Sequence, residues 1–352
     1  MSGQGVEFCR EQDLPELFER FADWYRFNPR MRERDYFDWQ FKHAPHRLAD
    51  SEYDFLILRE GGAIKGCLGF TGFEFEHEGR TATGGWTHNW YAQDRRDGGL
   101  ALLLRFMELV DNRFIIRFND NTARVFSLLK VPMVAALPRW WAAIDAEACL
   151  DLFKFGKQDA RVILQSAGDL PTSGGGGEQE IAQFDPSDDF SISHYGRDIA
   201  RAKRTGHYLN WRYFDIPRHN YRAIRSAGQF AIFRVEPVMG SSVSVIRILE
   251  WTFDAALTPR ALASIMNVAK DRRPILMDFH CSCEPIGRSI EHFGFVRQDA
   301  TTKPMPDLFR PTNYSGGNAI AIDLPPHRSE RLIDFTNWYI TSGDSDVDRI
   351  KL

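Results

Sequence analysis

The chain has 352 residues, of which 43% are hydrophobic and 13% aromatic, and a formal net charge of −4. This length predicts about two domains, and the composition excludes a disordered chain. The net charge is close to neutral and does not indicate the excess of positive charge that nucleic-acid binding requires, so we expect no nucleic-acid partner.

The sequence also bears on where the protein works. Its five cysteines do not form a spaced disulfide framework, and its N-terminus has no apolar signal-peptide core. Charged residues interrupt the apolar runs before they reach eighteen residues, which argues against membrane insertion. We therefore expect a soluble protein in the cytoplasm.

The first half of the chain alternates between strand and helix patterns. In chain order, the predicted elements are a strand over 6–10, helices over 14–25 and 34–42, strands over 53–59, 64–75 and 80–91, a helix over 100–110, a strand over 114–118, a helix over 122–130 and closing strands within 133–144.

The junction between the strand over 80–91 and the following helix carries the most specific motif. It reads Arg96-Asp97-Gly98-Gly99-Leu100-Ala101. Two glycines at this point leave backbone N–H groups open to close approach, which suits a phosphate. A strand-to-helix turn with glycine as a simple cap would give the same pattern.

The spacing Arg-x-x-Gly-x-Ala, between a strand and an amphipathic helix, resembles the pyrophosphate signature of the GNAT superfamily of acyl-CoA-dependent N-acetyltransferases. The resemblance implies acetyl-CoA as co-substrate, with its diphosphate on the loop amides and a backbone N–H near Tyr91 or Ala92 facing the thioester oxygen. The cofactor-binding residues that it implies are Tyr91, Ala92, Arg96, Asp97, Gly98, Gly99, Leu100, Ala101 and Asn119.

By the same resemblance, the catalytic base would lie on the strand before the loop, where His88 and Asn89 are the candidates. Strand alternation places Asn89 and Tyr91 on one face and His88 on the other, unless a bulge intervenes. A structural role for His88 is an equal alternative. The position that usually holds a tyrosine general acid is Phe126 here, so another group or water would protonate the leaving thiolate.

The second half begins after a glycine-rich stretch, residues 165–183, that reads as a linker. Residues 208–217 then repeat the pattern of 36–45 at an offset of 172, with identical Tyr, Trp and Pro. The predicted elements that follow are strands over 221–226, 230–235 and 243–251, a helix over 259–271, a strand over 274–279 and a helix over 285–292.

This repetition predicts a mixed α/β (α+β) fold of two tandem GNAT-like domains, each a mixed, mostly antiparallel sheet flanked by helices. The predicted divisions are residues 1–164 with the acyl-CoA site, 165–183 as linker, and 184–352 as a degenerate copy. The copy has no glycine pair between Trp251 and Pro259, so we expect no pyrophosphate site there.

Other conspicuous residues have simpler interpretations. His280, Cys281, Cys283 and His292 do not have a zinc spacing, so we predict no metal site. The tryptophans, Trp39 and Trp211 among them, are expected to form core and domain-interface packing.

Together these features favour a tandem-domain N-acetyltransferase. Its partner would be a small-molecule amine acceptor. The repeated segments 36–45 and 208–217 and the tail 337–346 resemble acetyltransferases of nucleotide-sugar and surface-polysaccharide pathways, which implies a nucleotide-linked amino sugar. Two alternatives remain. A Fem-like aminoacyl transferase would need a basic surface for tRNA, which the net charge of −4 disfavours. A non-catalytic binding or scaffold protein would explain Phe126.

Overall fold

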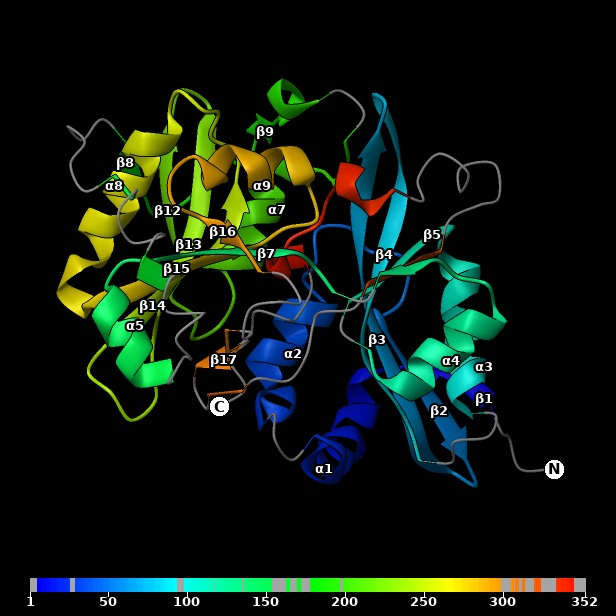
Figure 1. Cartoon of the computed structure of the whole chain (residues 1–352). Coiled ribbons are helices and arrows are strands. Elements are labelled where there is room, and N and C mark those ends of the chain that lie inside the picture. Colours follow the sequence, from blue (N-terminus) through cyan, green and yellow to red (C-terminus); the bar gives the residue numbers. More distant parts are fainter. Residues whose placement is uncertain are drawn as a thin grey trace.

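The structure is a computed structural model (Figure 1). It describes residues 5–25, 29–93, 98–116, 118–134, 136–153, 163–164, 170–171, 178–196, 199–298, 305–306, 308–309, 312–313, 320–323 and 334–344. Within these ranges no helix combines the length and apolar character needed to cross a membrane.

The first large sheet is built mainly from the first half of the chain. Its main path has the order β1-β2-β3-β4-β5-β19-β6, and β10 joins β3 to β20. Neighbours on this path are antiparallel except β4 and β5, which are parallel. The strands are β1 (Gly5–Phe8), β2 (Phe55–Glu60), β3 (Ala63–His77), β4 (Arg80–Ala92), β5 (Asn112–Ile116), β6 (Met133–Val134), β10 (Ala200–Ala202), β19 (Ile320–Asp323) and β20 (Trp338–Tyr339).

Helices cover both faces of this sheet because its strands are apolar on both sides. On β2, Phe55 and Ile57 pack under α1 (Leu14–Trp24) and α2 (Arg34–Phe41). The alternate residues Leu56 and Leu58 pack under α3 (Gly98–Leu109) and α4 (Asp120–Leu128). In Figure 1, α3 and α4 lie on the side of the first sheet that faces away from the second sheet.

The second large sheet has the order β16-β7-β15-β14-β13-β12-β8, and among its described strands β14 and β15 are parallel whereas the other neighbours are antiparallel. α8 and α9 pack on one face, and α5 and β17 on the other. The elements of this half are β7 (Arg139–Ala143), α5 (Ala146–Phe153), β8 (Gln179–Ile181), β9 (Asp189–Phe190), β11 (Arg204–Thr205), α7 (Gly206–Leu209), β12 (Arg222–Ser226), β13 (Gln229–Pro237), β14 (Ser244–Trp251), α8 (Thr258–Ala269), β15 (Pro274–His280), α9 (Glu284–Glu291), β16 (Val296–Arg297), β17 (Leu308–Phe309) and β18 (Thr312–Asn313).

The two halves of the chain exchange strands. β7, from the first half, pairs with β15 and β16 in the second sheet. β19, from the second half, pairs with β5 and β6 in the first sheet. Each sheet is therefore completed by a strand that is distant in sequence.

Most of the predicted elements are present, with ends within two residues of those expected. The prediction of closing strands over 133–144 was wrong for β7, because this strand finds its partner in the other sheet. The predicted linker contains β8, which pairs with β12, and residues 165–169 and 172–177 lie outside the described residues. The two sheets thus do not coincide with residues 1–164 and 184–352, and the division into domains stays a prediction.

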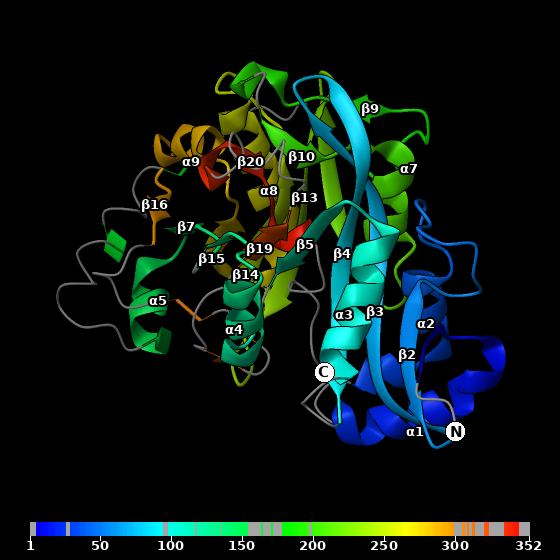
Figure 2. The same cartoon turned by 90° about the vertical axis from the view of Figure 1, so that its right-hand side faces the viewer.

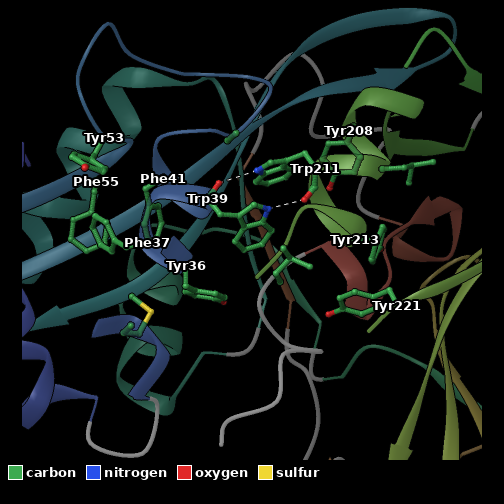
Figure 3. Close-up of a cluster of buried hydrophobic side chains, with 14 of the residues drawn as sticks. Tyr36, Phe37, Trp39, Phe41, Tyr53, Phe55, Tyr208, Trp211, Tyr213 and Tyr221 are labelled. Carbon is green, nitrogen blue, oxygen red and sulfur yellow. Dashed lines mark hydrogen bonds between the residues drawn. The ribbon is translucent and has the colours of Figure 1, made fainter. Parts of the chain in front are cut away.

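The repeated aromatic segments pack against each other in a buried cluster (Figure 3). The indole N–H of Trp39 donates to the carbonyl of Trp211 at 2.7 Å, and that of Trp211 donates to the carbonyl of Trp39 at 3.0 Å. The two rings stack with centroids 5.3 Å apart. Because residues 172 apart make the same bond to each other, the segments face one another with approximate twofold symmetry, and both tryptophans serve packing as predicted.

Candidate functional site

The candidate site begins where β4 separates from β5. The two strands pair only from Gly84 opposite Asn112 to Trp86 opposite Phe114. Beyond Trp86, β4 continues for six residues, paired in the described part of the chain with β3 alone. Two parallel strands that diverge in this way leave one edge of β4 open to a ligand.

A groove lies at this open edge, on the face of the sheet that Figure 2 turns toward the viewer. Its volume is about 640 Å³. The end of β4, the start of α3 and the length of α4 form its walls. The lining residues are Trp90, Tyr91, Ala92, Gly99, Leu100, Asn119, Asn121, Thr122, Val125, Leu128 and Leu129.

The first turn of α3 forms one wall of the groove. Gly98 is buried there, and a Cβ at this position would overlap the side chain of Leu58. Gly99 has more room, and its carbonyl accepts a hydrogen bond from the Trp90 indole at 3.1 Å. The N–H groups of a first helical turn have no partner within their helix, so they can bind an anion. Arg96 and Asp97 lie outside the described residues.

The remaining predicted cofactor residues are near the same place. Leu100 lines the groove and is exposed, whereas Ala101 is half-buried and does not line it. Asn119 caps α4, since its Oδ1 accepts from the backbone N–H of Thr122 at 3.0 Å. The structure thus brings Tyr91, Ala92 and the start of α3 together with Asn119 at one groove, and their role in cofactor binding stays a prediction.

A bulge in β4 changes which residues share a face. Cys67 pairs with Tyr91 and Gly69 with His88, so Leu68 lies opposite two residues, Asn89 and Trp90. Asn89 takes a left-handed conformation with φ of 50°. Asparagine tolerates this region better than most residues.

The bulge corrects the prediction from strand alternation. Tyr91 lies on the same side as His88 because the extra residue reverses the pattern after Asn89. Tyr91 stacks on Trp24, with ring centroids 4.6 Å apart, and both rings remain partly exposed. Trp90 packs on the opposite side, beside Phe126.

His88 is buried beneath the sheet and does not line the groove. Its side chain is 3% exposed, and its Nε2 lies 2.7 Å from the Thr71 hydroxyl. The ring of Phe41 lies beside it. A catalytic base must reach the proton that it accepts, directly or through water. The catalytic role of His88 therefore stays a prediction, and the structural alternative gains support from its burial.

The sequence missed half of the groove lining. Asn121, Thr122, Val125, Leu128 and Leu129 line it from α4 and the residue after it. Their spacing of three or four residues places them on one helical face, and this periodicity could have identified them.

In the second half, the chain itself fills the space where β14 and β15 end. The Ser282 backbone N–H donates to the Ile340 carbonyl at 2.9 Å, and Cys281 bridges to Thr341. The backbone N–H of Trp251, at the end of β14, donates to the Tyr339 hydroxyl at 2.9 Å. Residues 338–341 thus pack against the ends of β14 and β15, the parallel pair of the second sheet, and the lack of a second pyrophosphate site stays a prediction.

Buried ionic groups anchor this segment. Arg204 pairs with Glu250 at 3.0 Å and with Asp344 at 2.7 Å. Burial raises the pKa of Glu250, and the charge of Arg204 opposes that rise. The Tyr339 hydroxyl also donates to Glu250, at 2.8 Å.

Metal-binding groups do not gather in the described residues. No three or more His, Cys, Asp or Glu side chains among them could hold one ion. Cys281 and Cys283 are buried, and burial raises the pKa of Cys283 to about 12.

Comparisons with known proteins identify the fold. No family model matches the chain, and no curated protein is found to be similar to it. Among solved structures, the N-myristoyltransferase of Saccharomyces cerevisiae with bound myristoyl-CoA has a TM-score of 0.50 and 10% identity, over 90% of this chain and 79% of that one. A GCN5-related N-acetyltransferase from Anabaena variabilis has a TM-score of 0.50 and 8% identity, over 91% and 72%.

A probable N-acyltransferase from Enterococcus faecalis is similar at a TM-score of 0.49 and 11% identity, over 79% of this chain. The match spans 65% of that protein, slightly less than two thirds of its length. At these identities the likeness shows the fold alone, which is the mixed α/β fold of GCN5-related N-acetyltransferases that the sequence predicted.

Proposed function

We propose that the chain is an acyl-CoA-dependent N-acyltransferase that transfers acetyl from acetyl-CoA to the amine of a small acceptor. The observation that carries this proposal is the groove where β4 leaves β5, with the first turn of α3 and the capped start of α4 at its mouth. The fold supports the same class of chemistry. A nucleotide-linked amino sugar is the acceptor that we propose from the sequence resemblance.

The groove is chemically suited to a CoA ester. Open N–H groups at the start of α3 would hold the diphosphate, because they carry the positive end of the helix dipole. Apolar side chains, Leu100, Val125 and Leu128 among them, would contact the pantetheine and base. The unpaired edge of β4 would hydrogen-bond the amide groups of pantetheine as an added strand does.

The reaction requires an amine nitrogen to attack the thioester carbonyl carbon. The C–N bond forms, the C–S bond breaks, and the thiolate leaves and takes up a proton. The nitrogen loses a proton to water or to a base. The contribution of the chain is to orient the ester and to direct N–H donors at the carbonyl oxygen, where negative charge develops. Phe126 has no hydroxyl, so we assign thiolate protonation to water.

Binding of acetyl-CoA and release of its thiol test the proposal. Titration calorimetry measures binding, and a thiol-reactive dye measures turnover with a panel of amines that includes amino-sugar nucleotides. Binding with amine-dependent thiol release supports the enzyme. Binding without thiol release would instead favour the non-catalytic binding protein, and failure to bind would overturn the proposal.

A pair of α4 variants shows whether the groove is the binding site. Val125→Trp places a large side chain in the groove, whereas Ser127→Trp places it at an exposed position outside the lining. We expect Val125→Trp to lose binding and Ser127→Trp to retain it. Equal binding by both would place the ligand elsewhere.

A further inference from the structure

The carbonyl of Asn89 has unusual partners. It accepts hydrogen bonds from the Tyr25 hydroxyl at 2.6 Å and from the Cys67 thiol at 3.3 Å. Tyr25 ends α1, and both donors belong to the cluster between α1 and the sheet. A carbonyl held by side chains on this side is turned out of the strand ladder, toward α1.

The direction of this carbonyl fixes the direction of the next N–H. A peptide unit is planar and trans, so its C=O and N–H point in opposite directions. The N–H of Trp90 therefore points away from α1, toward the face on which the Trp90 indole packs against Gly99 and lines the groove. An N–H aimed in this way is suited to polarise a carbonyl bound in the groove.

We propose that Tyr25 is a positioning residue for the acyl transfer, because its hydroxyl holds the peptide between Asn89 and Trp90 so that the Trp90 N–H faces the acyl carbonyl. This inference rests on the proposed function. It also moves the donor from Tyr91 or Ala92, where the sequence placed it, to Trp90.

The left-handed conformation of Asn89 explains why a clamp is needed. Residues with a side chain are disfavoured at a φ of 50°, and neighbouring contacts must offset that cost. The Tyr25 and Cys67 donors provide such contacts. Without the Tyr25 hydroxyl, the peptide between Asn89 and Trp90 can rotate. The Trp90 N–H would then no longer point into the groove.

Tyr25→Phe tests the proposal, since it removes the hydroxyl and keeps the ring that packs on Phe21. We expect kcat to fall about tenfold, with the KM for acetyl-CoA within about twofold of the original, because the donor acts mainly in the transition state. With acetyl-CoA labelled with carbon-13 at the thioester carbonyl, the infrared stretch of the bound ester should shift toward its value in free solution.

Tyr53→Phe is the matched control. Its hydroxyl lies 2.9 Å from a carboxylate oxygen of Asp38 and 2.9 Å from one of Glu11, on the same side of the sheet. This variant should keep the original kcat and carbonyl stretch. If Tyr25→Phe does not fold, Cys67→Ala removes the other donor and should lower kcat by a smaller factor, again with little change in KM.

A double-mutant cycle with Asn89→Gly isolates the clamp. Glycine adopts positive φ without strain, so Tyr25→Phe should cost at most about twofold in kcat when residue 89 is glycine. Equal kcat of the wild type and Tyr25→Phe would overturn the inference and leave the proposed function intact. So would loss of stability or of acetyl-CoA affinity with kcat unchanged. If the wild type does not bind acetyl-CoA, the proposed function fails first.

Discussion

Gly99 allows the ligand-binding role of the α3 turn to be separated from its packing. An added Cβ would lie 3.6 Å from the Trp90 Nε1 and 3.7 Å from the Ala92 Cβ, which are ordinary contacts. Alanine also favours a helix over glycine by about 1 kcal/mol. Gly99→Ala should therefore fold at least as well as the wild type, with a Tm up to roughly 4 °C higher.

A longer side chain at the same position should block the ligand. Beyond the Cβ, the leucine side chain of Gly99→Leu extends into the groove that Gly99 lines. We expect the Kd for acetyl-CoA to rise at least tenfold, equivalent to about 1.4 kcal/mol. Calorimetric titration measures the affinity, and a thermal melt without ligand confirms that the variant is folded.

Gly98 serves as the comparison, because a side chain at this position would disturb the packing against β2 and would not reach the ligand. A Cβ there would overlap Leu58, and overpacking typically costs about 1–3 kcal/mol. Gly98→Ala should lower Tm, whereas Gly99→Leu should lower affinity. Unchanged affinity in Gly99→Leu would refute a ligand on this turn.

Three further predictions follow from other contacts. Trp211→Phe removes the indole N–H that donates to the Trp39 carbonyl, and it should lower the free energy of unfolding in urea by roughly 1–3 kcal/mol. An unchanged urea midpoint would mean that the reciprocal pair of hydrogen bonds contributes little to stability. Burial raises the pKa of Asp54 to about 6, although the charge of Arg47 opposes this rise. The folded state therefore binds the proton more tightly than the unfolded state, and ionisation of Asp54 lowers the stability of the protein as pH rises from 4 to 7. Asp54→Asn cannot titrate, so its stability relative to the wild type should rise over that range by up to about 3 kcal/mol, and a difference independent of pH in denaturant titrations would contradict this pKa. Asn119→Ala should lose about 1 kcal/mol with the α4 cap and also weaken acetyl-CoA binding, whereas Asn119→Asp should keep the cap in thermal melts; equal stability of the two variants would argue against the cap.

The local periodicity of apolar residues was sufficient to predict most of the individual helices and strands. The alternation of Phe55, Leu56, Ile57 and Leu58 between two clusters is the pattern of a strand covered on both faces. The leucine stripe of α3 is helical, and the two glycines that the sequence placed at the junction form the first turn of this helix. These features depend on neighbours in sequence, which is why they could be read directly.

Long-range pairing could not be read in the same way. Nothing in the composition of β7 or β19 distinguishes a strand that joins its own half from one that joins the other half. Partner choice depends on which sheet edge is open when the chain collapses, and that is a property of the whole fold. The exchange of these strands was therefore found only in the structure.

The position of the bulge in β4 could not be predicted from the sequence, for a different reason. The sequence reading allowed for a bulge near His88 but could not place it. Asn89 is one of several residue types that tolerate positive φ, and its carbonyl accepts a hydrogen bond from Tyr25, which is distant in sequence and follows α1. Side-chain direction along β4 consequently depended on a tertiary contact.

The exchange of strands has a consequence for biosynthesis. β5, the parallel neighbour of β4, pairs with β19, and β19 leaves the ribosome only after residue 320 has been translated. Domains commonly fold as they emerge, N-terminal part first. Here the leading half would keep one edge of its sheet exposed until residues 320–323 have been made. A gene fragment that encodes that half alone should thus yield an incomplete sheet that is prone to aggregate.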